Sequence, residues 1–220
     1  MSIIKFEVNK NNIKSNEKIR NDPCQNKLVQ MFVKKPKTLK MLRFTRDLLY
    51  EKNIDKINNL LIYGKRLYPI PEFNIIVECF NNWEENIIQN KFSNYMGIFV
   101  ELLVKYYLDE KFPDIKLHHE TRILVNDFKS YTLDYILETD ILSFFECKTS
   151  SYSLKIKDID NLIAIMHNLD YSKIYLIIFD NENRIHRRID DLKENLSNDI
   201  SYLDKFNIVS FEDFKNGNPF

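Results

Sequence analysis

Three short β-type segments, followed by a helix and a fourth β-type segment, most constrain how this 220-residue chain can fold. Residues 115–125, 131–138 and 141–149 are rich in β-branched and aromatic residues, and polar turn residues separate them. Residues 157–169 then follow the helical period, and residues 173–179 form an apolar run typical of a buried strand. We therefore expect a sheet that begins as a meander and continues through a helical crossover.

A helix is predicted before these strands. Ser93 or Asn94 can cap it, and it must end before Pro113. Between these points apolar residues recur at helical spacing, namely Met96, Phe99, Val100, Leu103, Val104, Tyr107 and Leu108. The predicted order is therefore helix, three strands, helix, strand.

The remaining segments are arranged around this order. Residues 1–90 have a mainly helical pattern that prolines interrupt, and we expect a helical extension used for nucleic-acid binding or oligomerisation. Residues 91–220 are predicted to form an α/β domain. Within it, residues 190–196 indicate a further helix and residues 206–211 a last strand.

The segment ILSFFECKTS, residues 141–150, ends an apolar strand with opposite charges at Glu146 and Lys148. Because side chains alternate along a strand, these two share one face. A hairpin with a loop of residues 139–141 places Asp134 directly opposite Glu146. Carboxylates in that position, with Cβ atoms about 4.5–5.5 Å apart, repel each other unless a cation lies between them.

A divalent metal resolves this repulsion. Mg²⁺ or Mn²⁺ binds through one or two carboxylates and keeps several waters, which leaves room for a phosphate oxygen. Lys148 would add a fixed positive charge suited to a transition state that gains negative charge. The alternative is an ordinary polar strand face, because the Asp/Glu-x-Lys tripeptide recurs at 114–116, 191–193 and 213–215, among other places.

Asp134, then twelve residues later Glu146-x-Lys148, behind the helical sequence YMGIFVELLVKYYL, resembles the PD-(D/E)XK nuclease superfamily. The resemblance implies the restriction-endonuclease-like fold, an αβββαβ core whose mixed central sheet is flanked by helices. It implies that Asp134 and Glu146 are metal ligands and that Lys148 is the catalytic cation. It also implies that Glu101, on the first helix, completes the metal site. Leu133 stands where the family name has proline.

Composition excludes several classes of function. Only three glycines occur, which excludes the Gly-rich phosphate loops of nucleotide-binding proteins. Three scattered cysteines without a CxxC pair indicate neither a disulfide framework nor a zinc site. The sequence shows neither a signal peptide nor a membrane-spanning run, so we expect a soluble cytoplasmic protein without membrane contact.

Residues 27–46 supply local positive charge in a chain whose 32 basic and 32 acidic residues balance. This stretch contains no acid and seven basic residues, Lys27, Lys34, Lys35, Lys37, Lys40, Arg43 and Arg46. Such a cluster attracts phosphates whatever the base sequence. The alternative is a solvated helix surface with Leu39, Leu42 and Leu49 turned inward. The basic run at 184–188 is a smaller candidate.

Together these features predict a metal-dependent nuclease, with an endodeoxyribonuclease favoured, that hydrolyses phosphodiester bonds by attack of a metal-activated water. Three alternatives stay open. They are a metal-dependent endoribonuclease of toxin-like or virus type, a catalytically inactive member of the fold that binds nucleic acid or protein, and a structural or inhibitory partner protein. Cutting both strands of a duplex would require a homodimer.

Overall fold

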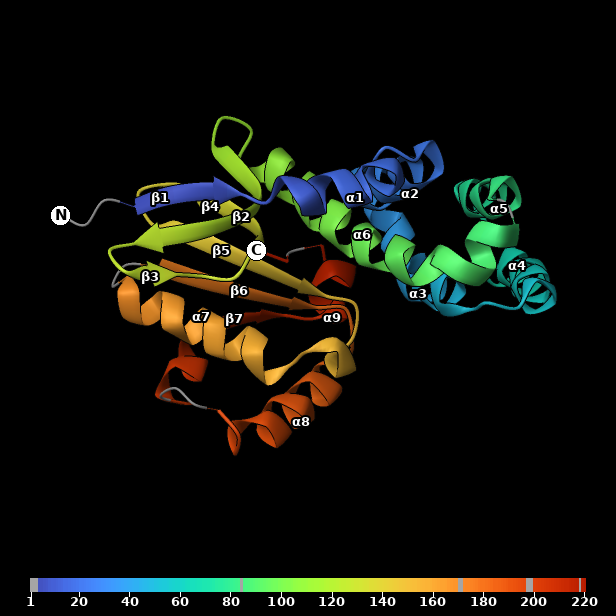
Figure 1. Cartoon of the computed structure of the whole chain (residues 1–220). Coiled ribbons are helices and arrows are strands. Elements are labelled where there is room, and N and C mark those ends of the chain that lie inside the picture. Colours follow the sequence, from blue (N-terminus) through green and yellow to red (C-terminus); the bar gives the residue numbers. More distant parts are fainter. Residues whose placement is uncertain (1–3, 84, 170–171, 197–199, 218) are drawn as a thin grey trace. The chain divides into compact units, whose positions relative to one another are not determined.

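The computed structural model describes residues 4–83, 85–169, 172–196, 200–217 and 219–220, with the backbone alone for residues 85–93. The chain divides into two compact units (Figure 1). The sheet unit comprises Met1–Ser15, Phe112–Asp213 and Pro219–Phe220, and the helical unit comprises Asn16–Lys111 and Phe214–Asn218. Among the helices so described, none combines the length and apolar character needed to cross a membrane.

The sheet unit is built on a mixed sheet, which has seven strands within the described residues. They are β1 (Ile4–Val8), β2 (Lys116–Val125), β3 (Phe128–Lys129), β4 (Leu133–Glu138), β5 (Leu142–Lys148), β6 (Ser172–Ile178) and β7 (Phe206–Val209). Their spatial order is β1-β2-β4-β5-β6-β7, with β3 beside β2. Pairs as far as β5 are antiparallel, whereas β5, β6 and β7 run parallel.

The core of this unit lies where the sheet meets two helices. Helix α7 (Ile156–Asn168) forms the crossover from β5 to β6, and helix α8 (Glu182–Lys193) follows β6 (Figure 1). Each buries one apolar stripe at helical spacing, with Ile159, Leu162, Ile163 and Ile165 on α7 and Ile185, Ile189 and Leu192 on α8. These side chains cluster with Ile136, Phe144, Ile174 and Leu176 of the strands.

The predicted element order is confirmed. Helix α6 (Glu85–Lys111) precedes β2, β4 and β5, then α7 and β6 follow, which is the αβββαβ order. The predicted hairpin register is confirmed too, because Tyr135 pairs with Phe145 and Leu137 with Ser143. This pairing closes the hairpin through residues 139–141, as expected. The fold is thus mixed α/β with a mainly helical N-terminal region.

The N-terminal region differs from the prediction in one strand. Ile4, Phe6 and Val8 alternate along β1, and this strand pairs with β2 through Ile4–Val125 and Val8–Thr121. Residues 4–15 therefore belong to the sheet unit. The assignment of residues 1–90 and 91–220 to separate domains stays a prediction.

Two predicted helix limits are wrong. Helix α6 begins at Glu85 and runs through Ser93 and Asn94, which therefore do not cap it, although it ends before Pro113 as expected. Helix α8 spans Glu182–Lys193 and not residues 190–196. It begins there because the Asn181 side chain accepts a hydrogen bond from the Arg184 backbone N–H at 3.0 Å.

The helical unit contains five more helices within its described part, apart from the short α9 (Phe211–Lys215). They are α1 (Lys10–Arg20), whose first residues belong to the sheet unit, α2 (Pro23–Lys34), α3 (Leu42–Tyr50), α4 (Ile54–Leu67) and α5 (Phe73–Asn82). Helix α2 starts with Pro23 at its first position, where the missing N–H costs nothing, and Asp22 caps it at 2.9 Å from the Gln25 N–H.

Gly64 of α4 lies directly against two aromatic rings. A Cβ atom there would lie 2.5 Å from the Cζ atom of Phe44 and would also meet Phe73. Both rings belong to a cluster with Tyr68. Glycine is therefore needed for the close approach of the rings and not for an unusual backbone angle.

We expect Gly64→Ala to lower the free energy of unfolding by about 1–3 kcal/mol, because overpacking outweighs the better helix propensity of alanine. The matched control is Gly97→Ala in α6, where an added Cβ meets nothing within 4 Å. That variant should gain about 0.5–1 kcal/mol. Urea unfolding of both variants measures the difference, and equal effects would contradict the packing argument.

Candidate active site

The end of the β4–β5 hairpin brings Asp134 and Glu146 together. Continuing the observed register one residue beyond Tyr135 and Phe145 sets these two acids opposite each other. The backbone N–H of Cys147 donates a hydrogen bond of 2.6 Å to Oδ2 of Asp134. The Asp134 carboxylate is therefore held against β5 at Cys147, the residue before Lys148.

Lys148 lies between two carboxylates. Its Nζ atom is 2.7 Å from Oε1 of Glu146, which confirms that the two side chains share one face of β5. The same Nζ atom is 3.2 Å from Oδ1 of Asp158 in the first turn of α7. Oδ2 of Asp158 accepts the backbone N–H of Lys155 at 2.8 Å, so Asp158 is fixed by capping its own helix.

These side chains are largely removed from water, with exposed fractions of 13% for Glu146, 13% for Asp158 and 16% for Lys148. Burial, followed by the nearby charge of Asp134, raises the pKa of Glu146 to about 8, although Lys148 opposes the shift. Burial alone would lower the pKa of Lys148. The carboxylates of Glu146 and Asp158 outweigh it and hold that pKa above its usual value.

Asp158 is a charged neighbour of Lys148 that the sequence prediction missed. An acid in the first turn of a helix is usually explained as a cap, and Asp158 does cap α7. The available signal was the parallel crossover itself. The end of β5 and the start of α7 lie only a few residues apart, so the first helical turn must return close to Lys148.

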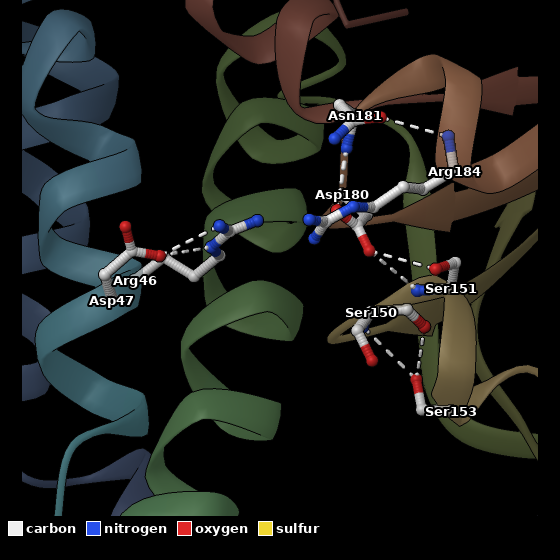
Figure 2. A network of polar contacts seen from close by, with 8 residues as sticks. All are labelled: Arg46, Asp47, Ser150, Ser151, Ser153, Asp180, Asn181 and Arg184. Atoms are coloured by element: carbon white, nitrogen blue, oxygen red, sulfur yellow. Dashed lines mark hydrogen bonds and ion pairs between the residues drawn. The ribbon is translucent and has the colours of Figure 1, made fainter.

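A polar network at the end of β6 fixes the chain segment that follows β5 (Figure 2). The Phe179 N–H donates to the carbonyl of Lys148 at 2.9 Å. Asp180, which is buried, accepts hydrogen bonds from the Ser151 hydroxyl at 3.0 Å and from the Asn181 N–H at 3.0 Å. The segment that leaves β5 is therefore tied to the neighbouring parallel strand.

A strained residue lies on the other side of β4. Glu120 of β2 has a left-handed φ of 47° and is buried, and the pairs around it, His119–Tyr135 and Thr121–Leu133, set it beside Asp134. Adjacent strand residues normally point to opposite faces. Here ligand atoms of His119 and Glu120 lie within 4.8 Å of each other, a spacing that suits a metal ion.

Glu101 belongs to the helical unit. It lies on α6 and forms an ion pair with Arg20, and both side chains are mostly buried. Its predicted role as a metal ligand beside Asp134 and Glu146 stays a prediction.

Much of the predicted basic cluster is paired with acids of the helical unit. Lys27 contacts Glu78 at 2.6 Å, Lys35 and Lys37 contact Glu72 at 3.3 and 2.8 Å, and Arg46 contacts Asp47 at 2.8 Å (Figure 2). The apolar residues Leu39, Leu42 and Leu49 are buried, as the alternative interpretation requires. The exposed cations that remain are Lys34, Lys40 and Arg43.

The second basic run, 184–188, lies on α8 and is also partly neutralised. Arg184 is 3.6 Å from Asp180 and His186 is 3.5 Å from Glu182. Arg188 donates a hydrogen bond to the carbonyl of Leu154.

No protein-family model matches the sequence, and no curated protein matches it. Among solved structures, protein VC1899 from Vibrio cholerae aligns over 97% of this chain and 56% of its own, at 13% identity and a TM-score of 0.46. Can2 from Sulfobacillus thermosulfidooxidans, in complex with cyclic tetra-adenylate, aligns over 97% of this chain and 54% of its own, at 14% identity and a TM-score of 0.41. The chain spans little more than half of either protein. Because both TM-scores are below 0.5, neither likeness supports a conclusion about the chemistry of this chain.

The raised pKa of Glu146 predicts how stability depends on pH without metal. Between the ordinary value of 4.5 and about 8, the folded protein holds a proton that the unfolded chain has released. The free energy of unfolding should therefore fall as pH rises through this window, by at most about 1.4 kcal/mol per unit from this group.

Glu146→Gln removes this dependence on pH. The free energy of unfolding of the variant, relative to that of the wild type, should therefore rise between pH 5 and 8, as measured by urea unfolding with EDTA. Glu138→Gln is the matched control, because a hydrogen bond from His118 and another from Lys116 lower the pKa of Glu138. Parallel curves for wild type and Glu146→Gln would contradict the assignment.

Proposed function

We propose that this chain is a metal-dependent nuclease of the PD-(D/E)XK superfamily, with DNA favoured over RNA as substrate. The observation that carries the proposal is the mostly buried group at the β4–β5 end, where Asp134 and Glu146 oppose each other and Lys148 bridges Glu146 to Asp158. A polar strand face in contact with solvent would not raise the pKa of Glu146 to about 8.

The side chains present fit a divalent cation. Asp134 and Glu146 offer hard oxygen ligands from adjacent strands, and their mutual repulsion is the cost that a cation would remove. Mg²⁺ or Mn²⁺, when bound, would lower the pKa of a water molecule and neutralise phosphate charge. We propose Asp134 and Glu146 as its ligands within the sheet unit.

Lys148 supplies the fixed positive charge. Its pKa above the usual value keeps the ammonium protonated at neutral pH, so it acts as an electrostatic stabiliser and not as a base. Glu146 and Asp158 orient the ammonium from two sides. The charge that develops on a phosphate during attack would then be met by a group that is already in place.

We expect Asp134→Asn, Glu146→Gln and Lys148→Ala each to reduce Mg²⁺-dependent cleavage of DNA by at least about 100-fold. The matched control is Asp114→Asn with Lys116→Ala, which alters the same tripeptide pattern at two exposed positions around the start of β2. That double variant should keep wild-type activity. EDTA should abolish cleavage, and Mg²⁺ or Mn²⁺ should restore it.

Supercoiled DNA, linear DNA and RNA of one length should be compared in this assay. Cleavage of RNA alone would identify an endoribonuclease. Nucleic-acid binding without cleavage under any metal would identify an inactive binding member of the fold. Full activity of Asp134→Asn would overturn the site assignment.

Asp158 is a positioning residue, since it contacts Lys148 and the backbone N–H of Lys155 that it caps. Asp158→Asn keeps an oxygen for the cap but removes the charge beside Lys148. We expect kcat to fall by about 10–100-fold with KM little changed. Asp160→Asn, two residues further along α7, is the control, and equal losses in both variants would contradict the assigned role.

A further inference from the structure

Two tyrosines are the most exposed large hydrophobic side chains in the described part of the sheet unit. Tyr131 is 65% exposed and Tyr152 is 75% exposed. The other three, Val8, Ile141 and Ile200, are aliphatic and are 40–52% exposed. An aromatic ring that lies in solvent offers a flat apolar face, which is the surface on which nucleobases stack.

The backbone of Tyr131 is hydrogen-bonded to helix α7, whose residue Asp158 contacts Lys148. Tyr131 lies three residues before Asp134, and its backbone N–H donates to Oδ1 of Asn161 at 2.8 Å. Asn161 is on α7, one turn after Asp158, which contacts Lys148. The ring is thus carried on a loop that is anchored beside the active-site residues.

Tyr152 lies four residues after Lys148, in a turn that is held by hydrogen bonds. In this turn, the Ser153 hydroxyl donates to the carbonyl of Ser150 at 2.6 Å, and the Ser150 N–H donates to Ser153 Oγ at 3.2 Å (Figure 2). Ser151 is bonded to the buried Asp180. Holding the turn in place reduces the entropy that a stacked base would otherwise cost.

We propose that Tyr131 and Tyr152 bind unpaired nucleobases, so that single-stranded nucleic acid is the substrate class of the nuclease proposed above, on which this inference rests. Bases in a duplex are stacked on their neighbours and do not present a free face. A single strand offers one face per nucleotide, and stacking tolerates any base. Tyr131 is tied to α7 at Asn161, and Tyr152 lies in the turn just before α7, so both rings are carried on segments joined to the helix whose Asp158 contacts Lys148.

Two lysines fit the same assignment. Lys155 and Lys157 are exposed at the start of α7, between Tyr152 and Asp158 in the sequence. Their charges suit the phosphates that link the stacked bases. Stacking sites combined with nearby cations are the arrangement that single-strand binding requires.

The test is binding in EDTA, where cleavage cannot occur, measured by fluorescence anisotropy. The probes are a labelled oligo-dT, the matching oligo-U and a blunt DNA duplex of one length. Tyr131→Ala and Tyr152→Ala should each weaken binding to both single strands by about 5- to 150-fold and leave duplex binding unchanged. Tyr131→Phe and Tyr152→Phe, which keep the ring, should bind like the wild type. Tyr63→Ala in α4, at a tyrosine that is 58% exposed, is the matched control.

Four results would overturn the inference: no loss in the alanine variants, an equal loss on the duplex, an equal loss in the phenylalanine variants, or no single-strand binding by the wild type. Single-strand binding without metal-dependent cleavage would reject the proposed nuclease while the base-stacking site stands. Cleavage that the tyrosine variants leave unchanged would reject the stacking site alone.

Discussion

The register between β4 and β5 is the constraint on which the candidate site depends. A slip of one residue would send Asp134 to the opposite face from Glu146 and Lys148. The hydrogen bond from the Cys147 N–H to Asp134 resists such a slip. On the other side of β5, Phe145 stacks on Tyr175 of β6 at 4.8 Å between ring centres, which fixes β5 against its parallel neighbour.

The charged groups of the site are unbalanced and largely buried. Three carboxyl groups, those of Asp134, Glu146 and Asp158, surround the ammonium of Lys148. The side chains of Glu146, Asp158 and Lys148 are each no more than 16% exposed. Removing one partner of such a group leaves an uncompensated charge, which costs several kcal/mol. The arrangement is therefore poor as a source of stability, and it is well suited to receive a further positive charge.

The parts of this arrangement that sequence reasoning predicted are the local ones. Side-chain alternation set Glu146 and Lys148 on one face, and hairpin geometry set Asp134 opposite, because both follow from spacings of a few residues. Asp158 was missed because its capping role is a sufficient local explanation. The neutralisation of Lys27 by Glu78 and of Lys35 by Glu72 could not be predicted, since those acids are 51 and 37 residues away in the sequence.

The four charged groups of the site all lie within residues 134–158, and the hairpin loop and the turn after β5 are the main interruptions. Loop closure inside so short a segment carries little entropy cost, so the site can form as soon as this hairpin and crossover do. The helical unit contributes neither a strand to this segment nor a turn within it. Substitutions in the helical unit can therefore change its surface without altering the spacing of these four groups along the chain.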